Sequence, residues 1–169
     1  MVRLLGAALV AAGTAWMGHR AATALGARAQ ALEEMAQGLS SLARELELEG
    51  APLARLMERL EGGVRGPAKR LVQGCRRALG RLDEENFPQA WRRLAGGLAE
   101  LGEAGAHALL PLGDVLGRCS REQQRMAVDC VRRRLEELAA QARQEYAQQG
   151  KVYRVLGCSA GAFFIILLL

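Results

Sequence analysis

The sequence predicts an all-α protein, a compact bundle of about six helices whose first and last helices are long and continue into membrane-spanning segments. Three features predict this fold class. Ala, Leu, Arg and Glu are frequent, whereas aromatic residues, which favour strands, make up only 4% of the chain. Apolar residues recur at spacings of three and four, the period of one helix face. Clusters of Gly and Pro divide this pattern into segments of helical length.

The first expected element is a transmembrane segment over residues 1–24. Its apolar run, Leu4 to Gly18, is short and rich in Ala and Gly, and Trp16 and Arg20 near its end suit a membrane interface. A secretory signal peptide is the alternative, because Ala22-Thr23-Ala24 offers a small-x-small cleavage site. We favour a retained anchor because the helical pattern runs on through that site, but the sequence leaves both retention and cleavage open.

A long helix is expected from residue 25 to the break at Gly50-Ala51-Pro52. Leu recurs in it every seven residues, which predicts one apolar face. These residues are Leu25, Leu32, Leu39 and Leu46. Two shorter helices should follow, from Pro52 to Leu60 and from Gly66-Pro67 to about Leu82, because Pro suits the first turn of a helix and Gly-Gly ends one.

A fourth helix is expected across Ala90-Trp91 to Leu101, after an acidic capping stretch at residues 83–86. Trp91 begins an apolar stripe with helical spacing, so we expect it to be buried, against the final helix. A fifth helix should run from about Ala104 to Arg118, bent or interrupted near Pro111.

The last helix is expected to start at Ser120, because Ser120 and Gln123 match a capping box. Its apolar residues alternate at three and four, as in a coiled-coil seam. They are Val128, Val131, Leu135, Leu138 and Ala142. Only Gly150 interrupts the sequence before the apolar end, so we expect a cytosolic bundle over residues 25–150.

Residues 151–169 form the second expected transmembrane segment. No charged side chain follows Arg154, and Phe163 to Leu169 all favour insertion into lipid. As a helix, the run from Val152 would reach about 27 Å, close to the thickness of the hydrocarbon core. The expected interface residues are Lys151, Tyr153 and Arg154, and the expected contact between membrane helices is the G-x-x-x-G pair Gly157 and Gly161.

The formal charge of +5 does not indicate a nucleic-acid partner. Four of the 23 basic residues, Arg3, Arg20, Lys151 and Arg154, flank the apolar ends, which leaves 19 basic against 18 acidic residues over residues 25–150. Binding to phosphate backbones needs uncompensated positive charge. The excess charge therefore belongs to the membrane interfaces, and we expect no nucleic acid among the partners.

The sequence offers no pattern for metal or covalent chemistry. Its four cysteines show no C-x-x-C spacing, and its two histidines, His19 and His107, are far apart. His107 lies in an apolar run, where a packed or partly exposed side chain is a better interpretation than a catalytic one. Without a Gly-rich phosphate loop either, we expect no enzyme activity, no cofactor and no metal.

Several short motifs occur in a fixed order along the whole chain. They are Leu4-Leu5-Gly6, Trp16-Met17-Gly18, Gly50-Ala51-Pro52-Leu53, Ala90-Trp91, Leu116-Gly117-Arg118, Arg121-Glu122, Gln124 and Tyr153-Arg154-x-Leu156-Gly157. In this order, and with two apolar ends, the sequence resembles the stage III sporulation protein AB family of endospore-forming bacteria. One departure is Ser120, where the family usually carries Asp; both residues cap helices.

The resemblance implies a fold like the cytoplasmic domain of type II secretion inner-membrane platform proteins. It implies residence in the mother-cell membrane around the forespore, with the bundle facing the cytosol. It also implies, as partners, a secretion-type ATPase and the other subunits of the stage III sporulation channel complex, besides the lipid bilayer. The sequence leaves open whether the chain forms a homo-oligomer.

The predicted function is that of a non-enzymatic platform or scaffold subunit, required for endospore formation, that couples the ATPase to channel components. Our candidate partner-binding residues are Arg118, Arg121 and Glu122, a cluster of charge at a helix junction. A well-capped helix start is the alternative interpretation of the same residues. The alternative function is a tail-anchored adaptor or membrane organiser of another system, which would predict an extended rod.

Overall fold

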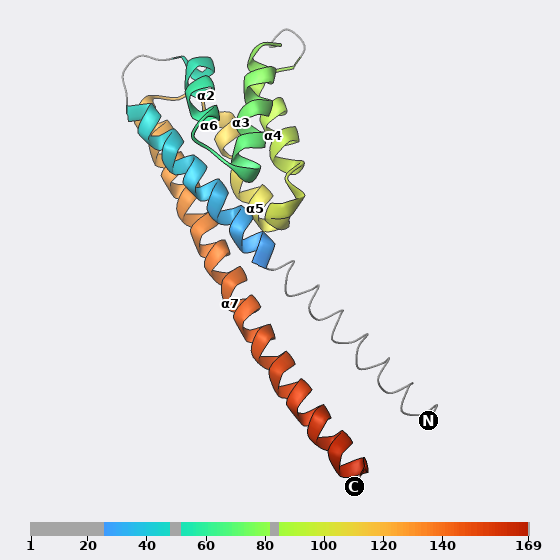
Figure 1. Ribbon diagram of the computed structural model, residues 1–169. Coiled ribbons are helices and arrows are strands. Elements are labelled where there is room, and N and C mark those ends of the chain that lie inside the picture. Colours follow the sequence, from blue (N-terminus) through green and yellow to red (C-terminus); the bar gives the residue numbers. More distant parts are fainter. Residues whose placement is uncertain (1–25, 48–51, 82–84, 169) are drawn as a thin grey trace. The chain divides into compact units, whose positions relative to one another are not determined.

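The computed structural model describes residues 26–47, 52–81 and 85–168, with side chains up to residue 148, and these residues form helices joined by turns (Figure 1). A helix over residues 26–47 comes first. It is followed by α2 (Leu53–Glu61), α3 (Gly66–Leu79), α4 (Phe87–Gly96), the 3-10 turn η1 (Ala99–Leu101), α5 (Gly102–Leu109), α6 (Leu112–Val115) and α7 (Arg121–Leu168). No strand occurs in these ranges, which confirms the all-α prediction.

The chain divides into two units. The larger, residues 28–140, is the helical bundle and contains most of the core. The smaller combines the two ends of the chain, residues 1–27 and 141–169. Within the smaller unit α7 continues as helix to Leu168, and the ring of Tyr146 lies against Gly26, 3.7 Å from where a Cβ atom would be.

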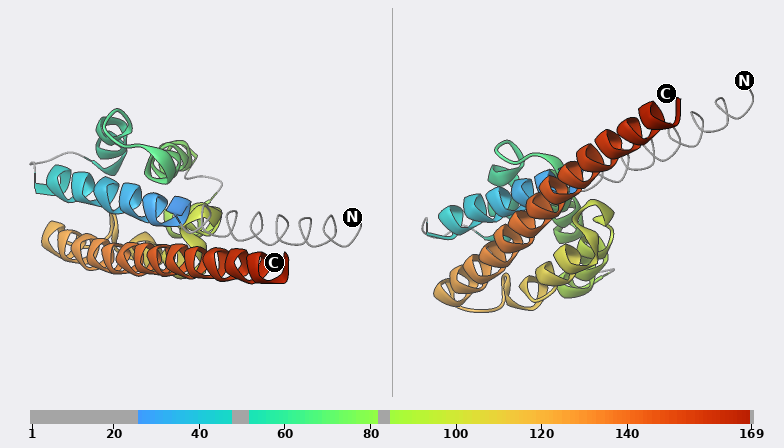
Figure 2. Two further views of the ribbon diagram at one scale, coloured as in Figure 1. Left: turned by 60° about the horizontal axis from the view of Figure 1, so that its bottom comes forward. Right: turned by 90° about the horizontal axis from the view of Figure 1, so that it is seen from below.

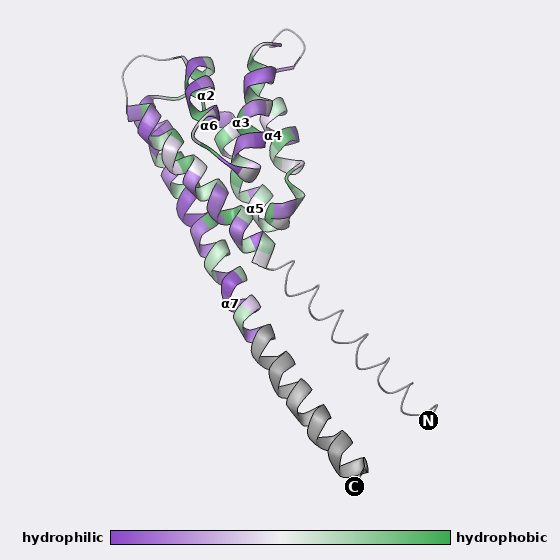
Figure 3. Cartoon of the chain, viewed as in Figure 1, coloured by the Kyte–Doolittle hydropathy of each residue, from purple (hydrophilic) through white to green (hydrophobic). Residues whose placement is uncertain are grey.

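In the bundle, the 26–47 helix and the first part of α7 lie side by side and run in opposite directions (Figure 2). Each of the two helices buries an apolar face: Leu32, Leu39, Val128 and Leu135 are all at most 3% exposed. Hydrophilic and hydrophobic residues alternate along both helices (Figure 3), as an amphipathic pair requires. The seam predicted from the spacing of three and four is thereby confirmed.

The shorter helices pack around Trp91 of α4, which is 2% exposed. Its indole Nε1 donates a hydrogen bond of 2.7 Å to the Leu109 carbonyl at the end of α5. A Cβ atom at Gly113 of α6 would lie 2.8 Å from the Trp91 ring, so glycine is needed for this close approach. The predicted burial of Trp91 is confirmed. Its neighbours include the short helices and also Met35 and Leu39 of the 26–47 helix, which line a small cavity with it; the predicted contact with the final helix stays a prediction.

Several predicted helix ends were wrong. α3 ends at Leu79, where Gly80 follows, and α4 ends at Gly96 because Gly97 caps it, five residues before the predicted end at Leu101. The separate turn η1 occupies the end of the range predicted for the fourth helix, and the expected fifth helix is divided into α5 and α6. The break near Pro111 was predicted correctly, since Pro111 is the N-cap of α6. In each case a glycine or proline ended a helix that apolar spacing alone would have extended.

The predicted membrane segments are not supported by the described side chains. No helix among the described residues is long and apolar enough to cross a membrane. Residues 1–24, with Trp16 and Arg20, lie outside the described part. Lys151, Tyr153, Arg154, Gly157 and Gly161 lie on the backbone of α7, where side chains are not described. Both membrane segments therefore stay predictions.

Candidate interaction surface

The turn between α6 and α7, residues 116–120, contains the polar groups that order the candidate surface. Gly117 has a positive φ of 75°, a conformation that favours glycine. Its backbone N–H donates to Oε1 of Gln124 at 3.3 Å, and Nε2 of Gln124 donates to the Cys119 carbonyl at 2.7 Å. Gln124, 8% exposed, is the one buried polar residue among the described side chains. This amide therefore ties the turn to the start of α7.

The start of α7 is capped as the sequence predicted. The Gln123 backbone N–H donates to Oγ of Ser120 at 3.4 Å, and the Ser120 backbone N–H donates to Oε1 of Gln123 at 3.1 Å. These reciprocal bonds satisfy two donors that a helix start leaves unpaired. The capping box is confirmed, and serine performs this role in place of aspartate.

Of the three candidate partner-binding residues, Arg118 lies on this turn, and Arg121 and Glu122 are the first two residues of α7. The side chains of Arg118, Arg121 and Glu122 are all exposed. Within the described part of the chain, none of the three takes part in an ion pair. Their role in binding a partner stays a prediction.

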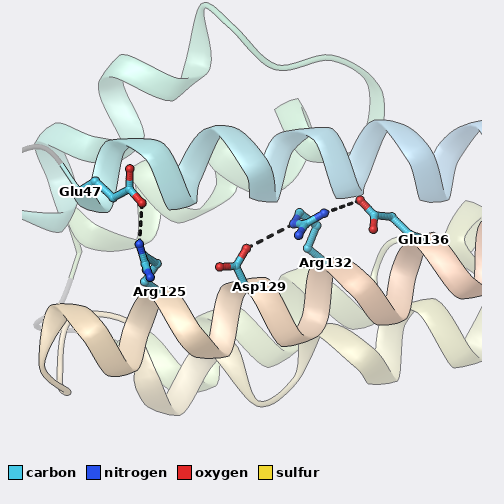
Figure 4. A network of polar contacts seen from close by, with 5 residues as sticks. All are labelled: Glu47, Arg125, Asp129, Arg132 and Glu136. Atoms are coloured by element: carbon cyan, nitrogen blue, oxygen red, sulfur yellow. Dashed lines mark hydrogen bonds and ion pairs between the residues drawn. The ribbon is translucent and has the colours of Figure 1, made fainter.

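Most neighbouring charges along α7 are paired instead (Figure 4). Arg125 binds Glu47 at 2.7 Å and so joins α7 to the end of the 26–47 helix. Arg132 lies between Glu136, at 2.6 Å, and Asp129, at 3.3 Å. Its hydrogen bonds to Glu136 and Asp129 raise the pKa of the Arg132 guanidinium. Exposed pairs of this kind contribute little to stability, but they leave these charges less available to a partner than those of the turn.

Sequence reasoning missed the role of Gln124. Its position, four residues before Val128 on the apolar face of α7, was the available signal. A polar residue at a core position needs hydrogen-bond partners, and the free backbone groups of the preceding turn supply them.

The groups considered for chemistry lie apart. His107 is exposed on α5, whereas Cys75 is buried in α3. Burial raises the pKa of the Cys75 thiol to about 12, which disfavours the reactive thiolate. Cys119 and Cys130 are exposed. No three His, Cys, Asp or Glu side chains in the described ranges are grouped as metal ligands.

The sequence model of the family described as stage III sporulation protein AB matches residues 3–169. The chain belongs to this family. Stage III sporulation protein AB of Bacillus subtilis (strain 168) is 24% identical over 176 residues, a match that covers 100% of both chains. Membership of the stage III sporulation protein AB family gives the chain a role in sporulation, with other sporulation subunits as its expected partners.

A solved structure of stage III sporulation protein AB superposes with a TM-score of 0.61 at 18% identity. The match covers 72% of this chain and 97% of that one. At this identity the likeness shows the shared fold. It confirms the compact helical bundle as the fold of this chain. The likeness to type II secretion platform domains stays a prediction.

Proposed function

We propose that this chain is a non-enzymatic platform subunit of the stage III sporulation channel complex. Its bundle would face the cytosol of the mother cell, held at the membrane around the forespore by residues 1–24 and 151–169. The bundle would dock a secretion-type ATPase and couple it to channel components in the membrane. Family membership supports the sporulation role, and the apolar, positively flanked ends of the sequence support the anchoring.

The docking proposal rests on three charged side chains at the α6–α7 turn and the start of α7, which are exposed and have no ion-pair partner among the described residues. Arg118, Arg121 and Glu122 are exposed beside a backbone held by Gln124 and by the capping box. A rigid backbone lowers the entropy cost of presenting charged side chains to a partner. These three side chains have no core to stabilise, so their loss should affect binding more than folding.

The form of α7 supports mechanical coupling. It is a single helix from Arg121 to Leu168 and therefore starts at the proposed docking turn and continues through the predicted second anchor. A partner that displaces the turn would act on the first residues of the same helix that enters the membrane. Continuous backbone hydrogen bonds make such a helix stiff along its length.

The test is a double charge reversal, Arg118→Glu with Arg121→Glu, in the full-length chain, leaving the cap at Ser120 intact. Association with the secretion-type ATPase should weaken by about tenfold or more, because reversed charges oppose the complementary surface. The free energy of unfolding should change by less than about 0.5 kcal/mol, as at other exposed positions. Both quantities can be measured in detergent, by interferometry and by chemical denaturation.

The matched control is Arg44→Glu with Arg133→Glu, which makes the same change of charge at two exposed positions outside the turn. It should leave the affinity nearly unchanged. If the turn variant captures the ATPase as tightly as the wild type, the docking surface lies elsewhere on the bundle and this assignment is wrong.

A further inference from the structure

Helices α3 and α4 pack against each other (Figure 1). A groove along them, lined by side chains of both helices, is not used by the proposed function. Two hollows of about 280 and 350 Å³ lie along it and share Arg77, Arg93 and Leu94 in their lining. The floor is apolar: Leu94 packs into a notch at Gly74, where a Cβ atom would lie only 2.5 Å from a Leu94 methyl. Leu71, Ala78 and Leu98 complete this floor.

The rim of this groove is basic. Arg93 is paired with Glu85 at 2.7 Å, and Arg70 is paired with Glu100. Arg77 donates only to the carbonyl of Gln73, one turn back in its own helix, and neither Arg77 nor Arg81 has a carboxylate partner among the described side chains. The lining of the groove therefore has two arginines, four residues apart in the sequence, whose charge no described carboxylate neutralises.

We propose that this arginine groove binds an acidic amphipathic helix of a protein partner. Carboxylates on one face of that helix would pair with Arg77, in the last turn of α3, and with Arg81, just beyond its end, because both line the same hollow. Apolar residues between them would cover Leu94 and the groove floor. Helix-in-groove recognition combines these two features, an apolar floor for anchors and a charged rim for orientation.

A role of these basic residues in helix stability explains only part of this arrangement. Basic residues in the last turn of a helix are favourable because they oppose its dipole, and Arg76 and Arg77 occupy the last turn of α3. Arg76 also pairs with Glu61 at 2.6 Å and faces α2. The dipole explains neither Arg81, which follows the helix, nor the half-buried Leu94 between the two hollows.

An anionic membrane surface fits the groove less well than a protein does. Figure 1 shows the end of α3 at the end of the bundle where the 26–47 helix ends. On the proposed anchoring, the membrane lies toward the end where that helix begins. Arg81 follows the last residue of α3, Leu79, by two positions and is therefore expected on the side of the bundle away from the lipid headgroups. Only this choice against lipid rests on the proposed function; the groove itself does not involve the α6–α7 turn.

The test uses the full-length chain in detergent and a defined probe, a fluorescent 15-residue helical peptide with Glu at two positions four residues apart and Leu between them. The wild type should bind it, and Arg77→Glu with Arg81→Glu should weaken binding about tenfold or more by fluorescence anisotropy. A peptide with Gln in place of Glu should bind the wild type as weakly as the acidic peptide binds that variant.

Two further variants make the result specific. Asp83 and Glu84 follow Arg81 in the sequence, outside the described residues, so Asp83→Asn with Glu84→Gln should tighten binding of the acidic peptide. The double variant Arg118→Glu with Arg121→Glu makes the same change of charge elsewhere and should leave peptide binding unchanged. This variant also separates the groove from the proposed ATPase docking surface.

Four results would overturn the proposal. The wild type could fail to bind the acidic peptide, or the Arg77/Arg81 variant could bind it as tightly as the wild type does. The control variant, Arg118→Glu with Arg121→Glu, could lose as much affinity, which would show that the acidic peptide responds to the net charge of the chain and not to the groove. If dihexanoyl phosphatidylglycerol, a water-soluble anionic lipid, distinguished the wild type from the Arg77/Arg81 variant while the peptide did not, the groove would be a lipid site instead.

Discussion

The long helix pair and the layer of short helices are stabilised in different ways. In the pair, many similar side chains share the burial, and Leu32, Leu39, Val128 and Leu135 are all at most 3% exposed. In the short layer, one large side chain, Trp91, makes a hydrogen bond to the Leu109 carbonyl and lies against one glycine, Gly113, that makes room for its ring. The pair should therefore tolerate substitution better than the layer, where stability is concentrated at a few positions.

The largest expected effect lies in the short layer. Trp91→Ala should lower the free energy of unfolding by about 3–5 kcal/mol, because it leaves a cavity and an unpaired Leu109 carbonyl. Chemical denaturation of the full-length chain, followed by circular dichroism, measures it. Leu39→Ala in the long pair should cost less than Trp91→Ala, and an equal or greater loss there would contradict the comparison.

The glycine that faces the Trp91 ring gives a second test of the same layer. Gly113→Ala should destabilise by about 1–3 kcal/mol, because its Cβ atom would lie 2.8 Å from the ring. Gly96→Ala is the matched control, since nothing lies within 4 Å of a Cβ atom there. That control should be neutral or slightly stabilising. Equal losses from the two substitutions would show that the notch at Gly113 is not tight.

Burial of Cys75 predicts a dependence of stability on alkaline pH. Its pKa is raised from 9.0 to about 12 in the fold. Burial of the neutral thiol therefore makes its full contribution to stability below pH 9. As pH rises from 9 toward 12 the unfolded thiol ionises and the folded one does not, so unfolding becomes easier by about 1.4 kcal/mol per pH unit. Cys75→Ala should remove the part of this pH dependence that comes from the Cys75 thiol. Cys130→Ala, at an exposed position, should leave the pH dependence unchanged.

The smallest expected change concerns the cap at the start of α7. Ser120→Ala should cost about 1 kcal/mol, because it leaves the Gln123 backbone N–H without its side-chain acceptor. Ser120→Asp should restore the cap. The loss in a Ser120→Ala, Gln123→Ala double variant should be smaller than the sum of the two single losses, because both residues belong to one reciprocal pair. Additive losses would indicate that the two hydrogen bonds act independently.

The difference between the long helix pair and the short layer also explains which features could be predicted from the sequence. The seam of the long pair and the capping box at Ser120 were predicted correctly, because both depend on local spacing. The layout of α4, η1, α5 and α6 was not, because apolar spacing continues across Gly97 and Gly102, where the backbone stops a helix or starts another. Gly102 has a φ of 68° and lies against the guanidinium of Arg28, from a distant part of the chain.

For the candidate surface, the sequence predicted the charged residues and the capping box. It did not predict the hydrogen bonds of Gln124 that hold the turn. The clustering of Arg118, Arg121 and Glu122 follows from their spacing and can be read directly. The buried amide of Gln124 and the basic rim of the α3–α4 groove depend on tertiary contacts. Whether an arginine has a carboxylate partner is decided by the neighbouring helix, as Arg76 and Arg77 illustrate.

The proposed function requires that both ends of the chain hold the bundle at the membrane, on its cytosolic side. A membrane-impermeant maleimide, added to intact sporulating cells, tests this most directly, because Cys119 and Cys130 are exposed on the bundle. The chain should remain in the membrane fraction after an alkaline carbonate wash. Both thiols should stay unlabelled until the cells are permeabilised and should then react, whereas the buried Cys75 should react only after unfolding. Labelling of Cys119 or Cys130 in intact cells, or release of the chain by the wash, would contradict the account.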